Sequence, residues 1–489
     1  MTIERIMEVI KSKHPDTDTT MLELAYELAE KAHKGQKRMS GEDYIQHPLE
    51  TAYRLAKMDI GMPTIIAGIL HDVPEETKYT LDDIQKDFGK EVANLVHGIT
   101  KLGTIKYRGL ERYAENLRKM FVAMADDVRV VFIKFADRIH NLKTLYALRP
   151  VKQQRIAKET LEIYAPIANR LGMTELQNEM EDLAFQYVYP EEYKWVVEIS
   201  KKKYEERRRD AAKIIKKIRV EIDKNNFKPV DIYGRAKRYY SLYKKLLRKD
   251  MDVDRIYDLV ALRIIAKDTD ECYRILGLIH SLCKPMTGRV KDYIAQPKPN
   301  GYRSLHTTVY YDNKIIEFQI RTKEMDEEAE WGIAAHWEFK ENTGKKVKIP
   351  VDPEKLKWIK ALMKQSGEDY NPQEYLEKIK MDFFKNRIFC FTPKGDVLDL
   401  PEGATPIDFA YHIHTYIGNH AIGAKINGEI ANLTKLLKSG DMVEILIDKK
   451  RAKPSQEWLD KVQTNLAREK IRQRLKSTDL SKIFKIFNR

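Results

Sequence analysis

The spacing of apolar residues along this chain first predicts helices. From residue 1 to about residue 195, apolar positions recur every three or four residues, as in MLELAYELAEKAHKG (residues 21–35) and PTIIAGILHDV (residues 63–73). Polar and apolar positions rarely alternate in this region. This spacing is typical of helices that bury one face. We therefore expect an all-helical domain over residues 1–195.

Residues 196–340 combine basic helical stretches with runs rich in β-branched residues. RIYDLVALRIIA (residues 255–266) and KIIEFQIRT (residues 314–322) are typical of strands, whereas ECYRILGLIHSLC (residues 271–283) is typical of a helix. The order of strand, helix and strand predicts a mixed α/β domain.

The rest of the chain predicts three further segments. Residues 341–386 form a polar linker with short helices. Residues 387–448 contain short strands broken by glycine and proline, with one helix at PIDFAYHIHT, an order that fits a small β-grasp module. Residues 449–489 form a basic helical tail. The expected fold class is therefore multidomain, α and α/β.

The composition is that of a globular protein. The 489 residues are 43% hydrophobic and 33% charged, enough for roughly three domains. Three cysteines without a CxxC pair exclude a disulfide framework and a zinc knuckle, and they suit a reducing cytoplasm. Since no run approaches the ~18 apolar residues of a membrane span, we expect a cytoplasmic protein without membrane contact.

The net charge of +14 is concentrated in two segments. Residues 201–250 hold 19 basic and 7 acidic residues, and residues 449–489 hold 13 basic and 4 acidic residues. Two basic segments on an otherwise acidic chain suggest two contacts with polyanions. The alternative is that both segments are solvated helix faces.

A candidate metal site lies in the helical domain. The apolar run of GILHDVPEET ends at His71 and Asp72, and His47 in YIQHP and Asp137 in KFADRIHN follow apolar residues on other predicted helices. Two imidazoles and two carboxylates suit Mn²⁺, Zn²⁺ or Fe²⁺ and leave positions open for water and substrate. The alternative for the quoted stretch alone is an amphipathic helix that meets solvent at its polar end.

The two acids after this stretch have a possible role beside the metal. Glu75 and Glu76 lie one turn beyond the candidate ligands, from where either could orient a metal-bound water. Pro74 cannot donate a backbone hydrogen bond, so we expect the helix to kink or end there.

The predicted α/β domain has a second group of polar residues. Alternation in IEFQIRT places Glu317, Gln319 and Arg321 on one strand face, and Asp258 begins the apolar run DLVALRII. If the two strands are neighbours, the carboxylates of Asp258 and Glu317 can hold Mg²⁺ against a triphosphate. Each acid by itself would be interpreted as a surface charge at a strand end.

Two nearby stretches suit nucleotide binding. Residues 233–249, YGRAKRYYSLYKKLLRK, contain seven basic residues and no acid, with tyrosines between them. In NGYRSLHT, Gly301 permits a close approach of backbone, and Tyr302 offers a flat face for a purine.

Several long motifs resemble one family. HDVPEET, FADRIHNLKTL and RIAKETLEIYAPIANRLG resemble the hydrolase domain of the RelA/SpoT alarmone enzymes, which make and destroy (p)ppGpp. GRVKDYIAQPKPNGYRSLHTTV and IEFQIRTKEMDEEAEWGIAAHW resemble the synthetase domain, and TPKGDVLDLPEGATPIDFAYHIHT resembles the TGS domain. The resemblance extends from about residue 20 to residue 475.

The resemblance implies a bifunctional enzyme of the stringent response. The synthetase, a nucleotidyltransferase-like domain, would transfer the β,γ-pyrophosphate of ATP to the ribose 3′-oxygen of GDP or GTP. The HD-type hydrolase would return (p)ppGpp to GDP or GTP and pyrophosphate. The implied cofactors are Mn²⁺ in the hydrolase and Mg²⁺ in the synthetase, and the implied partners also include the tRNA 3′ end and the ribosome. The resemblance does not indicate an oligomeric state.

Matching motifs position by position implies residue roles. In the hydrolase, His47, His71, Asp72 and Asp137 would hold the metal, and Glu75 and Glu76 would be catalytic. In the synthetase, Asp258 and Glu317 would lie at the metal and the attacking 3′-hydroxyl. The nucleotide-binding residues would be Arg38, Asn141, Arg235, Lys237, Lys245, Arg289, Lys291, Tyr302, His306, Gln319 and Arg321, and His412 and His414 would be candidates for meeting the tRNA end.

The chain departs from the family's pattern in three places. Glu76 stands where the hydrolase motif usually has aspartate, and Met39 follows Arg38 where lysine is usual. The sequence stops soon after the TGS module, so we expect a short form without the Cys-rich and ACT domains. Arg289 to Asp292 (RVKD) has the basic form of a loop found in bifunctional members, which favours both activities.

Other functions remain open. One is a synthetase with weak or lost hydrolase activity, and another is a non-catalytic adaptor for tRNA or the ribosome. A CCA-adding type of nucleotidyltransferase would need a Gly-Ser step before a DxD pair, and the strings at Asp252/Asp254 and Asp268/Asp270 lack that context.

Overall fold

The computed structural model describes residues 1–103, 109–225, 227, 231–253, 256, 259–298, 300–311, 314–336, 387–394, 396–438, 440–448 and 454–475. Contacts divide the chain into one unit of Met1–Tyr107 and Glu115–Gln365 and another of Arg108–Ala114 and Ser366–Arg489. The expected linker at 341–386 and the candidate residue Asp258 lie outside the described residues.

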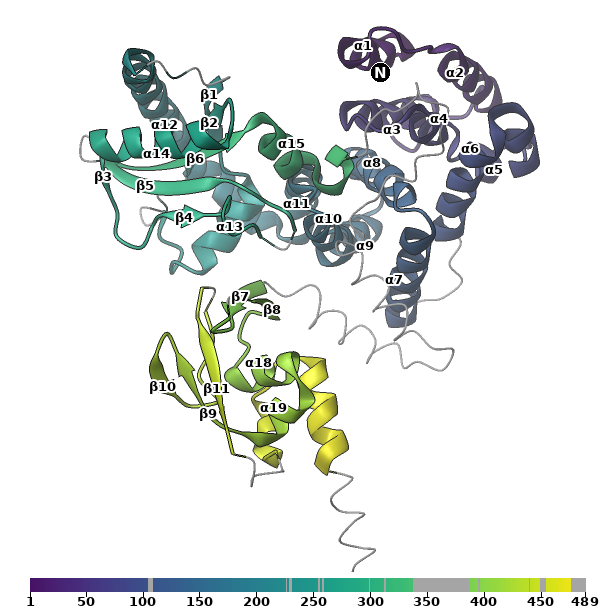
Figure 1. Ribbon diagram of the computed structural model, residues 1–489. Helices are drawn as coiled ribbons and strands as arrows, with labels where there is room; N and C mark the ends of the chain where they lie inside the picture. Colours follow the sequence, from purple (N-terminus) through teal and green to yellow (C-terminus); the bar gives the residue numbers. More distant parts are fainter. Residues whose placement is uncertain are drawn as a thin grey trace, which may run out of the picture. The chain divides into compact units, whose positions relative to one another are not determined.

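The N-terminal region is helical, as the apolar spacing predicts (Figure 1). Its helices are α1 (Ile3–Lys13), α2 (Thr20–Ala32), α3 (Gln46–Lys57), α4 (Met62–Leu70), α5 (Val73–Glu76), α6 (Leu81–Gly103), α7 (Gly109–Asp126), α8 (Arg129–Lys143), η1 (Leu145–Ala147), α9 (Pro150–Glu159), η2 (Thr160–Tyr164), α10 (Ala165–Arg170), α11 (Thr174–Val188) and α12 (Pro190–Lys224).

Helix α4 lies at the centre of this region. All of its residues except Pro63 are buried, and the helix contacts α2, α3, α6 and α8. At Gly68 an added Cβ would lie 2.5 Å from Leu55 Cδ1, so the absence of a side chain there lets α3 and α4 pack closely. This packing brings the N-terminal turn of α3 toward the C-terminal end of α4.

The helix break expected at Pro74 lies earlier in the chain. Helix α4 ends at Leu70, and Pro74 occupies the first turn of the short helix α5. A proline in a first turn removes a backbone N–H that has no helical partner there, so it starts α5 rather than breaking α4. His71 and Asp72 therefore lie in the turn between the two helices.

The second region contains a six-stranded mixed sheet. Its strands are β1 (Asp231–Ala236), β2 (Val260–Ala266), β3 (Lys284–Pro285), β4 (Lys291–Asp292), β5 (Leu305–Tyr311) and β6 (Lys314–Thr322). The order is β1-β2-β6-β5-β3, with β4 pairing β5, and only β2 and β6 run parallel. The expected mixed α/β fold is confirmed.

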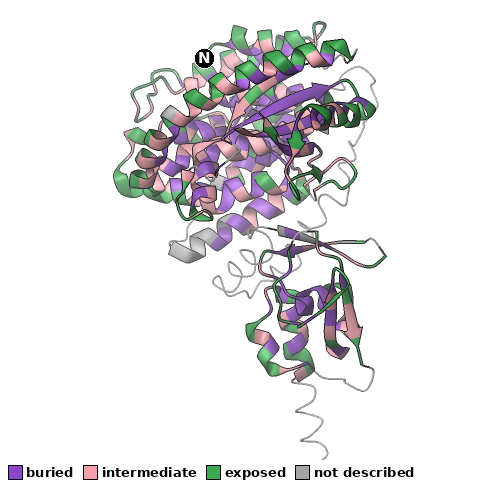
Figure 2. Ribbon diagram, turned by 90° about the vertical axis from the view of Figure 1, so that its left-hand side faces the viewer, coloured by how far each residue is buried: buried purple, intermediate pink, exposed green. Residues whose placement is uncertain are grey.

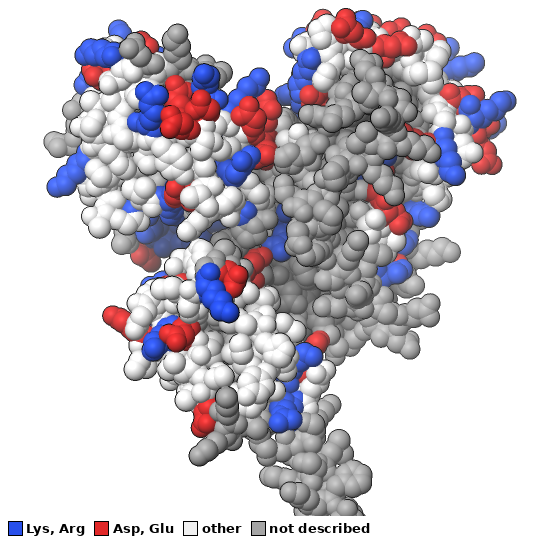
Figure 3. All heavy atoms as spheres, in the orientation of Figure 1, with Lys and Arg blue, Asp and Glu red and all other residues white. Residues whose placement is uncertain are grey.

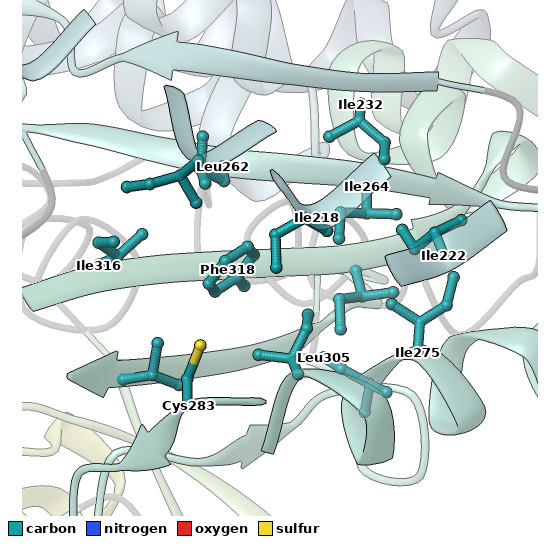
Figure 4. Close-up of a cluster of buried hydrophobic side chains, with 14 of the residues drawn as sticks. Ile218, Ile222, Ile232, Leu262, Ile264, Ile275, Cys283, Leu305, Ile316 and Phe318 are labelled. Carbon is teal, nitrogen blue, oxygen red and sulfur yellow. The ribbon is translucent and has the colours of Figure 1, made fainter. Parts of the chain in front are cut away.

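One face of this sheet is apolar. Helix α12 and helix α14 (Thr269–Leu282) pack against it. Figure 4 shows Ile218 of α12 beside Phe318, and Ile222 and Ile275 in the same cluster near Ile264. Alternation along β6 sends Ile316, Phe318 and Ile320 into this core. The opposite face is left to the polar residues of β5 and β6. Helices α13 (Tyr239–Leu247), α15 (Lys323–Trp331) and η4 (Gly332–His336) also belong to this region.

Helix α11 connects the helical region with the sheet region. Glu179 accepts two hydrogen bonds of 2.7 Å from Arg54 of α3, and Glu175 accepts one of 3.2 Å from Arg235 of β1. Two parallel Arg–carboxylate bonds fix both position and angle. The same helix therefore holds α3 on one side and β1 on the other.

The described part of the C-terminal unit contains two small sheets and several short helices. Strands β7 (Arg387–Phe391) and β8 (Val397–Pro401) form one sheet; β9 (Ala421–Ile426), β10 (Glu429–Ala431) and β11 (Val443–Ile447) form the other, in the order β10-β9-β11. The helices are α18 (Pro406–Ile413) and α19 (Thr415–His420), followed by the 3-10 helix η6 (Gln456–Asp460) and a helix over 465–475.

Two features of this unit differ from the simple sequence pattern. The helix expected at PIDFAYHIHT is α18, which ends at Ile413. A second helix, α19, follows it and was not predicted: His414 is extended, and its Nδ1 accepts a hydrogen bond from the Tyr416 amide at the start of α19. Part of the predicted tail is also packed. Trp458, Val462 and Ile471 belong to the same buried cluster as Ile407 of α18.

The outer surfaces carry both signs of charge. Figure 2 shows buried residues lining the inner faces of the helices and strands, with exposed residues outside. On the face drawn in Figure 3, basic and acidic side chains are interspersed. Among the described residues, no helix is both long and apolar enough to cross a membrane.

Candidate functional site

The four predicted metal ligands of the helical region lie together. His47 comes from the first turn of α3, His71 and Asp72 from the turn after α4, and Asp137 from α8. His47 Nε2 is 3.3 Å from Asp137 Oδ1 and 3.5 Å from Asp72 Oδ2, and His71 Nε2 is 3.2 Å from Asp72 Oδ1. Ligand atoms of His47, His71 and Asp137 all lie within 4.8 Å of one another. We call these four residues the His-Asp cluster.

The protonation states of the His-Asp cluster suit a cation. Burial lowers the pKa of His47, so its imidazole is neutral at pH 7. Burial alone would raise the pKa of Asp137, but the Lys134 ammonium and the His47 ring hold it well below its usual range. The His71 and His47 rings likewise outweigh burial and lower the pKa of Asp72. Neutral imidazoles and ionised carboxylates are the forms that bind metals.

The Nε2 atom of His71 supports a metal-binding role for the cluster. His71 is 2% exposed, and its Nδ1 is hydrogen-bonded to the Gly68 carbonyl at 2.9 Å. Its Nε2 is buried and makes no hydrogen bond within the described part of the chain. A buried imidazole nitrogen that faces carboxylates and lacks a hydrogen bond fits a metal ligand, because leaving it unpaired is otherwise costly.

Nucleotide candidates surround the cluster. Arg38 donates a 2.5 Å hydrogen bond to Asn141 Oδ1, and the Asn141 amide donates to Asp137. Glu75 and Glu76 are exposed beside the cluster. Desolvation and the Asp72 carboxylate raise the pKa of Glu75, which favours its use in proton transfer.

Two residues near the cluster were missed by the sequence analysis. Tyr44 donates a 3.0 Å hydrogen bond to Asp72 Oδ2, and Lys134 pairs with Asp137 Oδ2 at 2.8 Å. Tyr44 lies three residues before His47, and Lys134 lies one helical turn before Asp137. Their spacing from predicted ligands is the signal that could have identified them. Met39, where lysine was expected, is 80% exposed.

A second polar site lies on the polar face of the large sheet. In the register of β5 and β6, His306 is opposite Gln319, and Lys291 of β4 is opposite His306. His306 Nδ1 is 3.4 Å from Glu317 Oε1, Gln319 donates to Glu317 at 3.0 Å, and the Tyr302 hydroxyl is 2.7 Å from His306 Nε2. The structure thus brings five predicted residues together, which we call the strand site.

Arginines lie along the same polar face. Arg321 of β6 and Arg263 of β2 are each 1% exposed and are 3.0 Å from Asp326 of α15. Arg235 of β1 pairs with Glu175, and burial lowers the pKa values of Arg235 and Arg321. Arg263 was missed by the sequence analysis, although a charged residue inside the apolar run DLVALRII was a usable signal.

Lys298 was also missed. Its Nζ lies 4.7 Å from the ring centre of Tyr293 and 4.8 Å from that of Tyr302. Burial and the Lys291 ammonium lower the pKa of Lys298 to about 8. A partly desolvated cation above aromatic rings is placed to contact an anionic nucleotide.

The remaining candidates are less closely grouped. Asp258 lies outside the described residues, Arg289 is exposed before β4, and Lys237 and Lys245 are partly buried near α13. In the C-terminal unit, His412 and His414 are exposed at the end of α18.

Comparisons with known proteins match three parts of the chain. Residues 25–174 match an HD domain, residues 234–344 match a region found in RelA / SpoT proteins, and residues 388–447 match a TGS domain.

Curated relatives resemble nearly the whole chain. A guanosine-3′,5′-bis(diphosphate) 3′-pyrophosphohydrolase of Aquifex aeolicus is 46% identical over 483 residues, covering 98% of this chain and 68% of the relative. A GTP pyrophosphokinase of Myxococcus xanthus is 45% identical, covering 96% and 62%. The bifunctional (p)ppGpp synthase/hydrolase SpoT of Escherichia coli K12 is 43% identical, covering 97% and 67%. This chain therefore spans 62% to 68% of the length of these relatives.

Proposed function

Because this chain belongs to the RelA/SpoT family, we propose that it catalyses both the synthesis and the hydrolysis of (p)ppGpp. The observation that carries the proposal is the presence of two separate polar sites, the His-Asp cluster within the helices and the strand site on the sheet. A non-catalytic adaptor would need neither a buried cation site nor a carboxylate held beside a histidine.

We assign hydrolysis to residues 1–195 and propose Mn²⁺ as the metal of this activity. His47, His71, Asp72 and Asp137 would hold the ion, and the orphaned His71 Nε2 supports this assignment. When bound, Mn²⁺ supplies Lewis-acid activation of water and neutralises phosphate charge. In this proposal Arg38 and Asn141 bind the nucleotide, and the hydrogen bond that joins them supports a shared role.

The acids at the exposed edge of the cluster have separate roles in this proposal. Glu75, whose pKa is raised, exchanges a proton with the attacking water or the departing group. Glu76 orients the water or the pyrophosphate. Because Glu76 extends one methylene further than aspartate, we expect hydrolysis to be present and slower than with aspartate at this position.

We assign synthesis to residues 196–340. The proposed metal of this activity is Mg²⁺, and its proposed ligands are Asp258 and Glu317. Mg²⁺ held by these carboxylates would supply positive charge against the triphosphate and the leaving AMP. Glu317 accepts the proton of the ribose 3′-hydroxyl as that oxygen attacks the β-phosphorus of ATP. Its contacts with His306 and Gln319 fix the carboxylate for this step.

The nucleotide-binding side chains divide between the two substrates. The guanine of GDP or GTP stacks on Tyr302, with Lys291 and Lys298 close by. The ATP phosphates meet Arg235, Arg321 and the basic stretch that includes Lys237 and Lys245, with Arg289 at the edge of the site. Carboxylates now paired with these arginines would give way to phosphate, since guanidinium groups bind both in similar geometry.

For the C-terminal unit we propose a binding role. Residues 388–447 match a TGS domain, and His412 and His414 are exposed at the end of α18. We propose this surface as a contact for the tRNA 3′ end, on or off the ribosome. Replacing both histidines with alanine should weaken tRNA binding in a filter assay and leave synthesis without tRNA unchanged.

Resolving nucleotides after two incubations tests the two activities. With ATP, GDP and Mg²⁺ the chain should produce ppGpp and AMP; after transfer to Mn²⁺ without ATP, ppGpp should return to GDP and pyrophosphate. Formation of ppGpp without its later loss would leave the chain as a synthetase alone. No ppGpp in either direction would favour the adaptor.

A further inference from the structure

A buried histidine beside the His-Asp cluster has no role in the proposal above. His140 lies on α8, one turn after Asp137, and is 5% exposed. Its Nδ1 is 2.9 Å from Nδ1 of His47, and the ring centres are 5.0 Å apart with planes inclined by 42°. His47 and His140 are 93 residues apart in the chain, so only the packing of α3 on α8 brings the rings together.

The contact restricts where the His47 proton can lie. Two imidazole nitrogens at this distance form a hydrogen bond only if one carries hydrogen and the other offers a lone pair. His47 Nε2 faces Asp137 and Asp72, and a nitrogen that binds a cation must present its lone pair. The hydrogen of His47 must then be on Nδ1, which donates to His140 Nδ1.

His71 shows the same arrangement with a different acceptor. Its Nδ1 donates to the Gly68 carbonyl, which leaves Nε2 free to face the carboxylates. For a ligating histidine, a fixed acceptor on the second nitrogen sets both the tautomer and the ring orientation. The first turn of α3 offers no such carbonyl to His47 among the described contacts, and His140 supplies the acceptor instead.

We propose that His140 is a positioning residue for the hydrolase metal: it accepts the Nδ1–H of His47 and so holds His47 Nε2 toward the cation. This inference rests on the proposed metal role of His47. The alternative is that His140 only fills space between α3 and α8, in which case the chemistry of its side chain would be unimportant.

A matched pair of variants separates the two roles. In His140→Asn, the amide oxygen takes nearly the place of Nδ1 and can accept the same hydrogen bond; His140→Leu has almost the same shape and no acceptor. The Mn²⁺ dissociation constant of the full chain is measured by electron paramagnetic resonance of free Mn²⁺. We expect about ten- to a hundredfold weaker binding for the leucine variant and nearly parental binding for the asparagine variant.

Two controls keep the outcomes distinct. If His47→Ala binds Mn²⁺ as tightly as the parent, the proposed metal site itself is wrong. If His47→Ala loses Mn²⁺ while the leucine variant binds normally, or while both His140 variants weaken equally, the positioning role is wrong and the metal site stands. Synthesis of ppGpp by each variant reports that the chain is folded.

A measurement on the parent chain tests the inference without altering His140. After labelling with ¹⁵N-histidine, the nitrogen chemical shifts of His47 in the protein loaded with diamagnetic Zn²⁺ report which nitrogen carries the hydrogen, with His47→Ala assigning the signals. We expect hydrogen on Nδ1. Hydrogen on Nε2 would overturn the proposal.

Discussion

Replacing Tyr302 tests the guanine site with two variants that remove different parts of one side chain. Tyr302→Ala removes both the ring and the hydroxyl, whereas Tyr302→Phe removes only the hydroxyl. In the structure the ring lies 4.8 Å from Lys298 Nζ, and the hydroxyl is 2.7 Å from His306 Nε2. The ring is thus proposed to bind guanine, and the hydroxyl to hold the histidine that contacts Glu317.

The expected magnitudes differ between the two variants. Stacking of a base on an aromatic ring is worth ~1 to 3 kcal/mol, so Tyr302→Ala should raise KM for GDP roughly ten- to a hundredfold. KM for ATP should change by less than about threefold. In Tyr302→Phe the stacking remains, and loss of one neutral hydrogen bond of ~1 kcal/mol should lower kcat by about fivefold with KM for GDP nearly unchanged.

Steady-state synthesis supplies these values, with GDP varied at saturating ATP and ATP varied at saturating GDP. An equal rise in both KM values for Tyr302→Ala would indicate collapse of the loop rather than loss of stacking. A phenylalanine variant as impaired in GDP binding as the alanine variant would refute the stacking role.

Three further predictions address other sites. Glu76→Asp should hydrolyse ppGpp at least as fast as the parent and Glu76→Gln at least about tenfold slower, as measured by Mn²⁺-dependent release of pyrophosphate; an equally fast glutamine variant would make Glu76 a solvated charge. Because the pKa of Lys298 is about 8, its charge is lost as pH rises through that value, so KM for GDP should increase above pH 8 and Lys298→Arg should flatten this rise. Gly332→Ala should lower the free energy of unfolding by about 2 kcal/mol more than Gly288→Ala. Both glycines have positive φ, but only at Gly332 would an added Cβ clash with backbone, 2.2 Å from the Leu171 oxygen. Equal melting temperatures of the two variants in calorimetry would contradict this.

Local patterns predicted those features that depend on neighbours in the chain. Three- and four-residue spacing predicts the N-terminal helices, and alternation in IEFQIRT predicts a strand with Glu317 and Gln319 on its polar face. Sequence alone also indicated candidate metal ligands, because His71 and Asp137 each follow an apolar run that had to be buried. The structure places His47 and Asp137 3.3 Å apart, as a shared site requires.

Features that depend on packing between distant segments were not predicted. His140 meets His47 only because α3 packs on α8, and Arg263 finds Asp326 only because α15 folds back beside β2. Likewise the charge pattern predicts a basic tail at Trp458, whereas the structure buries this residue in the C-terminal core. Sequence periodicity reports which face of an element is buried, and it does not report which partner covers that face.

Separating the two activities by mutation tests the account most directly. The full chain is compared with Asp72→Ala and Glu317→Gln, with ppGpp hydrolysis measured in Mn²⁺ and ppGpp synthesis measured in Mg²⁺. We expect Asp72→Ala to lose hydrolysis and retain synthesis, and Glu317→Gln to lose synthesis and retain hydrolysis. Parental hydrolysis by Asp72→Ala, or loss of both activities in either variant with an unchanged melting temperature, would contradict the assignment of two independent sites.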